Sequence, residues 1–522
     1  MNPATSIVSD SAAELGVTPF LLTIAGHDPG GGAGLGADLA AWNAMGWRGA
    51  SACTALTVQG ARGVQEVHPT DPGVLAASLR AVLADGRPAG IKLGMLGASG
   101  AVGVARDVCA GFTSGPVVWD PVRAGGAGGV ALLNADDGAL DALARVCDVI
   151  TPNRDEAAAL LGLTPWTDAG PLPAAWLAAM RERWLVGGRT CAVVLKGGHA
   201  QGRLSVDWLI TRDTTRAFAV PRLPDRGGRR AHGTGCLFAS ALTAMLAEGW
   251  SVADAVAEAQ WRTHAGIAQA AWQQRPLANA AARLDSSSMP VAGAPGACPE
   301  APAPDFPPLL EPCGLYPIAP DADWVMRLLD WGARTVQLRI KHLEGAAMRG
   351  DIDRAAAAAR AAGAQLFIND HWREAIDAGA FGVHLGQEDL DAGGVPALAA
   401  LRAAGLRLGL STHTPAEMAR AHAESPSYIA CGPVYPTTQK QLAYGALGLR
   451  RLRDWAARCR PRYPLVAIGG ITLDRLGPVL DCGVDGAAVI GAIVQADDPR
   501  AALRVGMERA RQVLACRAAT VG

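Results

Sequence analysis

The sequence predicts an α/β protein of two units, an open, mostly parallel sheet followed by an eight-stranded (β/α) barrel. At 522 residues the chain is too long for one compact core. Short β-branched runs alternate with Ala-rich amphipathic stretches, which is the pattern of parallel strands joined by helices. Residues 284–312 are rich in Pro, Ala, Ser and Gly and predict a linker. We therefore expect a flexible tail (1–19), a sheet unit (20–283), the linker and a barrel unit (313–522).

The expected elements follow in chain order. In the first unit they include strands at 20–26, 90–96, 116–122, 148–151 and 191–198, and a helix at 239–248. In the second unit, apolar runs recur about every 20 to 30 residues, which is the rhythm of a (β/α) barrel. These runs are 335–340, 364–370, 382–386, 407–412, 428–434, 464–470 and 486–491.

Composition limits the functional classes. The 47 basic and 48 acidic residues give a net charge of −1, so no global charge attracts nucleic acid or an anionic membrane. The first 20 residues contain no Lys or Arg and no apolar run of signal-peptide length, and no run of about 18 uncharged apolar residues occurs in the sequence. The 11 cysteines contain no CxxC pair, which predicts reduced thiols. We expect a soluble cytoplasmic protein with small-molecule substrates, and a homo-oligomer is possible.

Two glycine-rich segments in the first unit precede helices. Residues 25–39, AGHDPGGGAGLGADL, follow the first strand, and such a segment is either a plain turn or a ligand loop. It is not a P-loop, because no Gly-Lys-Ser/Thr closes it. Gly233, Thr234, Gly235 and Cys236 begin an apolar helix, where converging N–H groups suit a transferring γ-phosphoryl group. The Cys236 thiol is either the base for the attacking hydroxyl or a buried, inert cysteine.

Polar residues at two other strand ends indicate nucleotide chemistry. Asn153 and Glu156 lie three residues apart at a strand-to-helix junction, where they can bind Mg²⁺. Alternatively, Glu156 completes a capping box. Lys196 ends an apolar strand before two glycines, which fits a phosphate.

Seven strings, AGHDPGGGAG, ALTVQ, KLGMLG, DPV, TPNRDEA, VLKGGH and HGTGC, resemble hydroxymethylpyrimidine-phosphate kinases of the ribokinase superfamily. This resemblance implies ATP as co-substrate, with Lys196 and Cys236 as catalytic residues. The family commonly has other residues at His27 and Gly31, so a non-catalytic binding or assembly module remains an alternative, as does a pyridoxal kinase. The resemblance implies a pyrimidine site of Gly26, Ala33, Asp38, Gln59, Met95 and Val122, and an ATP and Mg²⁺ site of Asn153, Glu156, Lys196, Gly233, Thr234 and Gly235.

The second unit combines cations with carboxylates at predicted strand ends. Gln337, Arg339 and Lys341 alternate along one strand, and two cations on one strand face call for an anion. Asp370 and Asp389 follow neighbouring strands and converge at the top of a barrel, where they can hold Mg²⁺. Either carboxylate alone could instead simply solvate a loop.

Hydroxyl groups, a lysine and glycines follow the later strands. Thr437, Thr438 and Lys440 offer hydroxyls and a cation to phosphate oxygens. Gly469, Gly470 and Gly491 end the last two predicted strands, where many barrels bind phosphate through main-chain N–H groups.

The strings QLRIK, IND, HLGQED, GLSTHT, GPVYPTTQK and AIGGI through VIGAI resemble thiamine-phosphate synthase. This resemblance implies that pyrophosphate leaves the pyrimidine and that the thiazole nitrogen captures the cation, with Arg339, Lys341 and Lys440 stabilising the leaving charge. His384 and His413 are interpreted as structural or lining residues. An indole- or phosphosugar-type barrel enzyme is the alternative. The resemblance assigns Gln337, Arg339, Lys341, Asn369, Ser411, Thr437, Thr438 and Lys440 to the pyrimidine pyrophosphate, Asp370 and Asp389 to Mg²⁺, and Gly470, Ile490 and Gly491 to the thiazole phosphate.

Overall fold

The computed structural model divides the chain into two compact units, Met1–Ala301 and Pro302–Gly522. It describes residues 19–60, 63–123, 131–168, 170–198, 201–223, 232–273, 277, 284–436 and 445–521. Residues 1–18 of the predicted tail lie outside the described residues.

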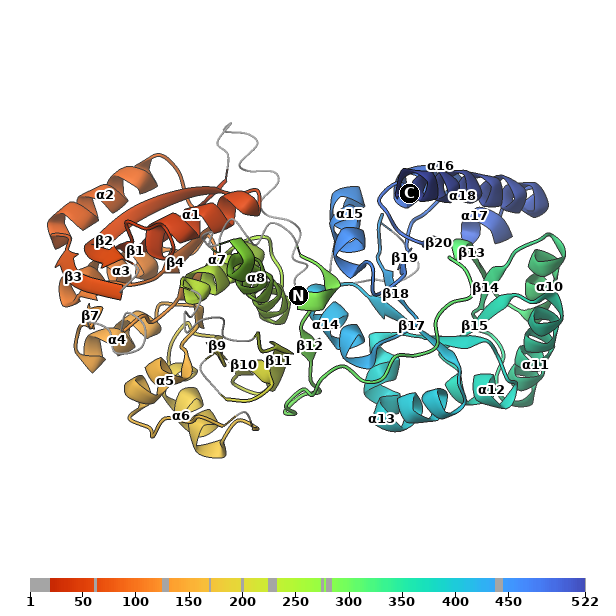
Figure 1. Ribbon diagram of the computed structural model, residues 1–522, viewed down its shortest axis with the longest axis horizontal. Helices are drawn as coiled ribbons and strands as arrows, with labels where there is room; N and C mark the ends of the chain where they lie inside the picture. The colour runs from red at the N-terminus through yellow and green to blue at the C-terminus, as the bar shows by residue number, and fades with distance from the viewer. Residues whose placement is uncertain are drawn as a thin grey trace. The chain divides into compact units, whose positions relative to one another are not determined.

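The first unit is built on a ten-stranded mixed sheet with the order β12-β11-β10-β9-β8-β6-β4-β1-β2-β3 (Figure 1). The strands from β2 to β9 in that order run parallel, and antiparallel pairs flank them on both sides. The strands are β1 (Phe20–His27), β2 (Arg48–Gly60), β3 (Gly63–Pro69), β4 (Gly90–Leu93), β6 (Val117–Trp119), β8 (Val149–Ile150), β9 (Ala192–Leu195), β10 (Leu204–Thr211), β11 (Thr215–Pro221) and β12 (Val291–Ala292), with β5 (Gly97–Ala98) and β7 (Leu133–Asn134) in a small separate sheet.

Helices cover both faces of this sheet, which explains why its parallel strands are apolar on both sides. The contacts separate the helices into two groups. One group is α1 (Gly34–Ala44), α7 (Thr234–Ala247) and α8 (Val252–Gln273), and the other is α2 (Pro72–Ala84), α3 (Ser99–Gly111), α4 (Asp137–Ala144), α5 (Arg154–Leu161) and α6 (Ala174–Trp184).

The predicted linker is partly wrong, because it contributes structure to the first unit. Within it, Ser286–Ser288 form the 3₁₀ helix η2, and β12 pairs antiparallel with β11. Two apolar residues, Val291 and Ala292, supply this edge strand, and both are buried. A short buried strand carries too few residues to show a period in a Pro-rich segment.

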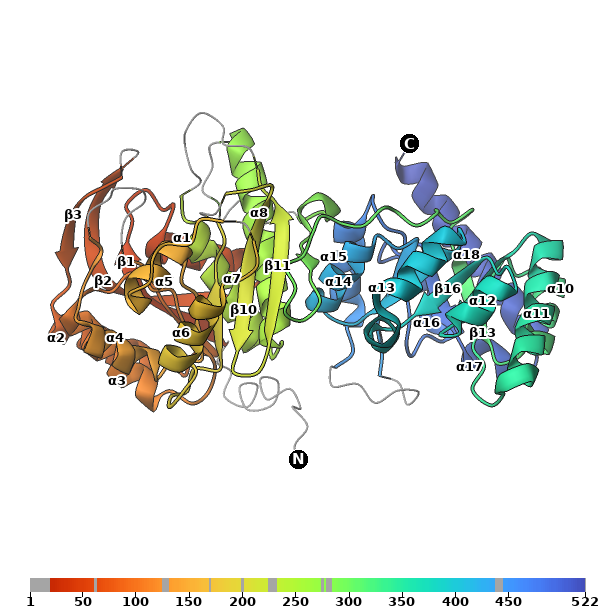
Figure 2. The ribbon, with the colours of Figure 1, turned by 90° about the horizontal axis from the view of Figure 1, so that it is seen from below.

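The second unit is a closed barrel of eight strands, β13 to β20, in sequence order (Figure 2). Every neighbouring pair is parallel, and β20 closes the barrel on β13. The strands are β13 (Gly314–Ala319), β14 (Thr335–Leu338), β15 (Gln365–Asn369), β16 (Gly382–Leu385), β17 (Arg407–Thr412), β18 (Tyr428–Cys431), β19 (Leu465–Ala467) and β20 (Gly486–Val489), and the helices are α10 (Ala322–Asp330), α11 (Gly345–Ala362), α12 (Trp372–Asp377), α13 (Gln387–Ala403), α14 (Pro415–Glu424), α15 (Gly448–Cys459), α16 (Leu473–Leu480), α17 (Gly491–Val494) and α18 (Pro499–Val521).

The predicted fold class, an open sheet followed by a (β/α)8 barrel, is confirmed. The first barrel strand, β13, was not predicted, because Gly314 and Pro317 argue against a central strand. Within the described residues, no helix combines the length and the apolarity needed to cross a bilayer.

Candidate active sites

Two glycine-rich segments of the first unit meet at the carboxyl end of the parallel strands. A Cβ atom built on Gly233 would lie 1.8 Å from the carbonyl oxygen of Gly32, and Gly233 has a φ of 81°. The Gly34 N–H donates to Cys236 Sγ at 3.3 Å. The helices α1 and α7 therefore begin side by side, and only glycine fits at this approach.

Lys196 lies against this helix start and forms an ion pair that the sequence analysis missed. Its Nζ lies 2.6 Å from Oδ1 of Asp120, which is 1% exposed and also accepts from Thr151. A Cβ on Gly235 would lie 3.2 Å from both Asp120 Oδ2 and Lys196 Nζ. Although burial opposes it, Asp120 and then Glu156 raise the pKa of Lys196, so the ammonium stays charged. The available signal for this residue was its position, since Asp120 directly follows Trp119 at the end of an apolar strand.

Asn153 and Glu156 form the capping box that the sequence analysis kept as an alternative. The Asn153 side chain accepts from the Glu156 N–H, and the Glu156 carboxylate accepts from the Asn153 N–H at 2.7 Å. Burial and the Asp120 carboxylate raise the pKa of Glu156 to about 7, against the opposing effect of Lys196. The box uses the single amide oxygen of Asn153 and one carboxylate oxygen of Glu156, so a cation beside Glu156 and Asp120 fits the carboxylate oxygens that remain.

Asp38 was predicted to contact the pyrimidine, but its side chain is engaged elsewhere. It is 0% exposed, and Lys92 Nζ lies 2.8 Å from its Oδ2 in an ion pair between two fully buried side chains. Thr23 and Ser240 donate to the same carboxylate. Both oxygens are therefore occupied, and Asp38 holds α1 against β4 instead of facing a ligand.

Other residues of the predicted pyrimidine site do come together. Met95 and Val122 pack in one apolar cluster. A Cβ on Gly26 would lie 2.9 Å from Met95 Sδ, so glycine is needed beside this side chain. Gln59 contacts His232 Nε2 at 2.8 Å, and the same nitrogen lies 3.0 Å from Asp28 Oδ2.

Burial opposes the predicted activation of the Cys236 thiol by the helix start. Burial raises the pKa of the Cys236 thiol to about 11, and the nearby Lys92 ammonium only partly offsets this effect. The thiol is therefore protonated at neutral pH, although it lies beside Lys92, Asp120 and Lys196.

Two carboxylates meet at the carboxyl end of the barrel. Burial, and then the neighbouring Asp389 carboxylate, raise the pKa of Asp370 to about 6, and Arg339 opposes this shift. Asp370 has a φ of 65°, which is rare for a residue other than glycine and often marks a functional site. Asp389 also accepts from the Gly386 N–H at the start of α13. Two carboxylates that repel each other fit a divalent cation.

Only one residue of the predicted triplet Gln337, Arg339 and Lys341 lies within a strand. Gln337 is 2% exposed and belongs to β14, while Arg339 and Lys341 follow its last residue. The charge of Arg339 lowers the pKa values of both Asp370 and His384, so it lies near both residues. Asn369 ends β15 beside His384 in the strand register.

Ser411 and two histidines have well-defined partners. Ser411 Oγ lies 2.8 Å from His384 Nε2 inside the barrel. His413 Nδ1 lies 2.8 Å from Glu417 at the start of α14, which supports its structural interpretation. Thr437, Thr438 and Lys440 lie outside the described residues.

The residues predicted to bind the thiazole phosphate follow two neighbouring strands. Gly470 comes after β19, Ile490 and Gly491 come after β20, and these strands pair with each other. Gly470 has a φ of 67°, and a Cβ there would lie 2.8 Å from the Pro436 carbonyl oxygen. Ile490 precedes α17 and Gly491 begins it. Among the described residues, no group of three or more His, Cys, Asp or Glu side chains forms a ready metal site.

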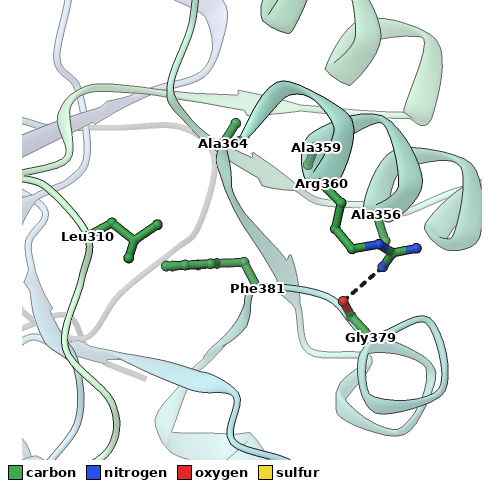
Figure 3. A pocket seen from close by; sticks show the side chains of 8 residues that line it. Leu310, Ala356, Ala359, Arg360, Ala364, Gly379 and Phe381 are labelled. Atoms are coloured by element: carbon green, nitrogen blue, oxygen red, sulfur yellow. Dashed lines mark hydrogen bonds between the residues drawn. The ribbon is translucent and has the colours of Figure 1, made fainter.

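A cavity of about 280 Å³ lies at the opposite end of the barrel (Figure 3). Its lining includes Ala364 and Phe381, which directly precede β15 and β16. Arg360 there donates to the carbonyl oxygens of Ala378 and Gly379 at 2.7 and 2.9 Å. This cavity is separate from the carboxyl strand ends that carry the candidate site.

Comparisons with known proteins divide the chain at the same place. A family model described as "Phosphomethylpyrimidine kinase" matches residues 28–276, and one described as "Thiamine monophosphate synthase" matches residues 315–493. The thiamine-phosphate synthase of Neisseria meningitidis serogroup B is 51% identical over 199 residues, covering 38% of this chain and 95% of the relative. The chain belongs to the thiamine-phosphate synthase family. In front of this synthase domain it carries a phosphomethylpyrimidine kinase domain.

Solved structures also resemble the kinase domain. A pyridoxal kinase from Staphylococcus aureus in complex with ADP is 27% identical with a TM-score of 0.42, covering 48% of this chain and 89% of that chain. A phosphomethylpyrimidine kinase from Clostridium difficile is 28% identical with a TM-score of 0.38, covering 46% of this chain and 95% of that chain.

Proposed function

We propose that the chain catalyses consecutive steps of thiamine biosynthesis. The kinase domain transfers phosphoryl groups from ATP to 4-amino-5-hydroxymethyl-2-methylpyrimidine and then to its phosphate. The synthase domain joins the resulting pyrophosphate to 4-methyl-5-(2-phosphoethyl)thiazole, which gives thiamine monophosphate and pyrophosphate. The observation that carries this proposal is the presence in one chain of both domains, since the first makes the compound that the second consumes.

In the kinase domain, the start of α7 would receive the γ-phosphoryl group, because its N–H groups and the Lys196 ammonium converge there. The substrate oxygen attacks phosphorus, the bond to ADP breaks, and the hydroxyl proton leaves late in a loose transition state. Asn153 and Glu156 would hold a Mg²⁺, which supplies positive charge to the phosphates when bound. Cys236 would accept the proton of the substrate hydroxyl after ligand binding has changed the surroundings of its thiol.

In the synthase domain, the carbon–oxygen bond to pyrophosphate breaks and the thiazole nitrogen then bonds to the resulting methylene cation. Arg339 and Lys341 would stabilise the leaving charge, so no protein nucleophile is required. Asp370 and Asp389 would hold a Mg²⁺, which supplies further positive charge to the pyrophosphate when bound. Main-chain N–H groups of Gly470, Ile490 and Gly491 would bind the thiazole phosphate.

The test is a coupled assay that starts from the hydroxymethylpyrimidine, ATP and thiazole phosphate and measures thiamine monophosphate. We expect product from the intact chain. Cys236→Ala should abolish it, and added pyrimidine pyrophosphate should restore it. If the intact chain itself needs added pyrimidine pyrophosphate, the first domain is a non-catalytic module, the alternative suggested by His27 and Gly31. Pyridoxal in place of the pyrimidine tests the other alternative, which the kinase match does not favour.

A further inference from the structure

Five polar side chains form one hydrogen-bonded chain across the barrel interior, which we call the barrel relay. Gln337 Nε2 lies 3.4 Å from the Tyr316 hydroxyl, and the Tyr316 and Tyr428 hydroxyls are 3.1 Å apart. The Tyr428 hydroxyl lies 2.7 Å from His384 Nδ1, and His384 Nε2 lies 2.8 Å from Ser411 Oγ. The relay thus joins two residues predicted to bind the pyrimidine through three residues with no such assignment.

The barrel relay is held in place by packing. Tyr316 and Tyr428 are 1% and 0% exposed and belong to the interior cluster, where the Phe367 ring packs edge-to-face against both. A Cβ on Gly409 would lie 2.4 Å from the Tyr428 hydroxyl oxygen, so glycine there makes room for this group. The relay is therefore a fixed part of the barrel core.

The imidazole in the relay is neutral. The His384 side chain is 5% exposed and its two ring nitrogens bond to the hydroxyls of Tyr428 and Ser411 instead of to carboxylates, and a buried imidazolium without a counter-charge is unfavourable. A neutral imidazole donates from one nitrogen and accepts at the other, so it transmits the direction of a hydrogen-bond chain. Each tyrosine hydroxyl has one hydrogen, and leaving that hydrogen unused in a buried site is costly.

These constraints allow two arrangements. In the first, Gln337 donates to Tyr316 and the chain ends with His384 donating to Ser411, which leaves the Gln337 carbonyl oxygen as an acceptor and the Ser411 hydroxyl as a donor. In the second, the Gln337 amide is turned so that its carbonyl oxygen accepts from Tyr316 and every other bond reverses, so Gln337 offers its amide N–H and Ser411 offers its oxygen. In both, the two ends present opposite polarity.

We propose that Tyr316, Tyr428 and His384 are positioning residues that force Gln337 and Ser411 to present one donor and one acceptor, so the site selects a pyrimidine edge that carries both. An aminopyrimidine has such an edge, since its amino group donates and the adjacent ring nitrogen accepts. This inference rests on the proposed synthase function.

The first experiment interrupts the relay at Tyr428→Phe, and independently at Tyr316→Phe in case one variant fails to fold. We expect the KM for the pyrimidine pyrophosphate to rise about tenfold with little change in kcat, because the lost contact serves ground state and transition state alike. The KM for thiazole phosphate and inhibition by inorganic pyrophosphate should not change. Unchanged pyrimidine KM in both variants would overturn the proposal, and so would equal losses for all three ligands.

Tyr463→Phe is the matched control. Tyr463 forms a buried bond to His422 Nδ1 at 2.7 Å, but His422 lies on α14 and Tyr463 precedes β19, away from the carboxyl strand ends. This variant also deletes one buried tyrosine hydroxyl from the synthase domain. We expect the KM values for both substrates and the inhibition by pyrophosphate to stay at the wild-type values.

The second experiment tests polarity directly by calorimetry on the full chain, so that it does not depend on turnover. The ligands are the pyrimidine pyrophosphate and an analogue with methoxy in place of the amino group, which carries two acceptors. Wild type should bind the analogue at least about tenfold more weakly than the pyrimidine pyrophosphate. In Tyr428→Phe, the ratio of the two dissociation constants should fall below about threefold. A ratio that survives in the variant contradicts the relay, whereas a wild type without turnover contradicts only the proposed function.

Discussion

One buried charge pair in this protein is surrounded by a complete set of partners. Lys92 and Asp38 are both 0% exposed, and the carboxylate accepts from Lys92, Thr23 and Ser240. Burial alone would lower the pKa of Lys92, yet the Asp38 carboxylate raises it above its usual range. The pair therefore depends on both members remaining charged.

Asp38→Asn should lower the free energy of unfolding of the kinase domain by about 3–5 kcal/mol, because it leaves a buried ammonium without its counter-charge. Denaturant unfolding of the full chain measures this loss. The double variant Asp38→Leu, Lys92→Met removes both charges and should recover most of it. A single variant as stable as wild type would show that the pair is not needed.

Glycine also acts at the residue scale by leaving space for an aromatic ring. A Cβ on Gly409 would lie 2.1 Å from Tyr428 Cζ. Gly409→Ala should therefore cost about 1–3 kcal/mol by overpacking. Gly350→Ala, in α11 with no atom within 4 Å of the built Cβ, is the control and should be neutral or stabilising, as thermal unfolding can measure.

At the scale of elements, the proposed kinase site depends on the start of α7. Gly233→Ala would bring a Cβ against the Gly32 carbonyl oxygen and push the glycine-rich segments apart. We expect kinase turnover to fall by about 100-fold, because small displacements of catalytic groups have effects of that size. Synthase turnover with supplied pyrimidine pyrophosphate should be unaffected.

Gly249→Ala separates this collision from backbone strain. Gly249 follows the same helix with a φ of 85°, but a Cβ there has nothing within 4 Å. Its replacement should lower stability by about 1 kcal/mol and keep kinase turnover. Equal loss of turnover in both variants would mean that strain, and not the contact with Gly32, is responsible.

The sequence was sufficient to predict features that are formed by consecutive residues. Gly233 to Cys236 stand together in the chain, so the helix start could be predicted from their order. It failed where partners come from distant strands. Asp38 lies 54 residues from Lys92, and its residue type does not reveal whether it faces a ligand or a buried lysine. Asp120 and Tyr316 were missed for the same reason, since each acquires its role only when neighbouring strands are assembled.

At the scale of the whole molecule, neutral buried histidines link stability to pH. Burial lowers the pKa of His384 to about 4 and of His422 to about 3, with nearby arginines contributing. Both values lie below the ordinary 6.5, so the unfolded chain takes up these protons first. The two neutral histidines contribute their full stabilisation of the fold above pH 6.5. This contribution is lost as the pH falls from 6.5 to about 4 for His384 and to about 3 for His422.

His422→Asn should therefore reduce the slope of unfolding free energy against pH by about 1.4 kcal/mol per pH unit between roughly pH 6 and 4. Denaturant midpoints at several pH values measure this slope in the full chain. A variant with the wild-type slope would show that His422 takes up its proton without unfolding.

The edge strand β12 has a practical consequence for dissecting the two enzymes. Because Val291 and Ala292 complete the sheet beside β11, a shortened chain ending at residue 283 would expose the N–H and C=O groups of that strand. Such an open edge invites pairing between molecules. Recombinant kinase that stops there should aggregate, whereas a version extended through Gly296, whose N–H is bonded to Thr215, should remain monodisperse in light scattering.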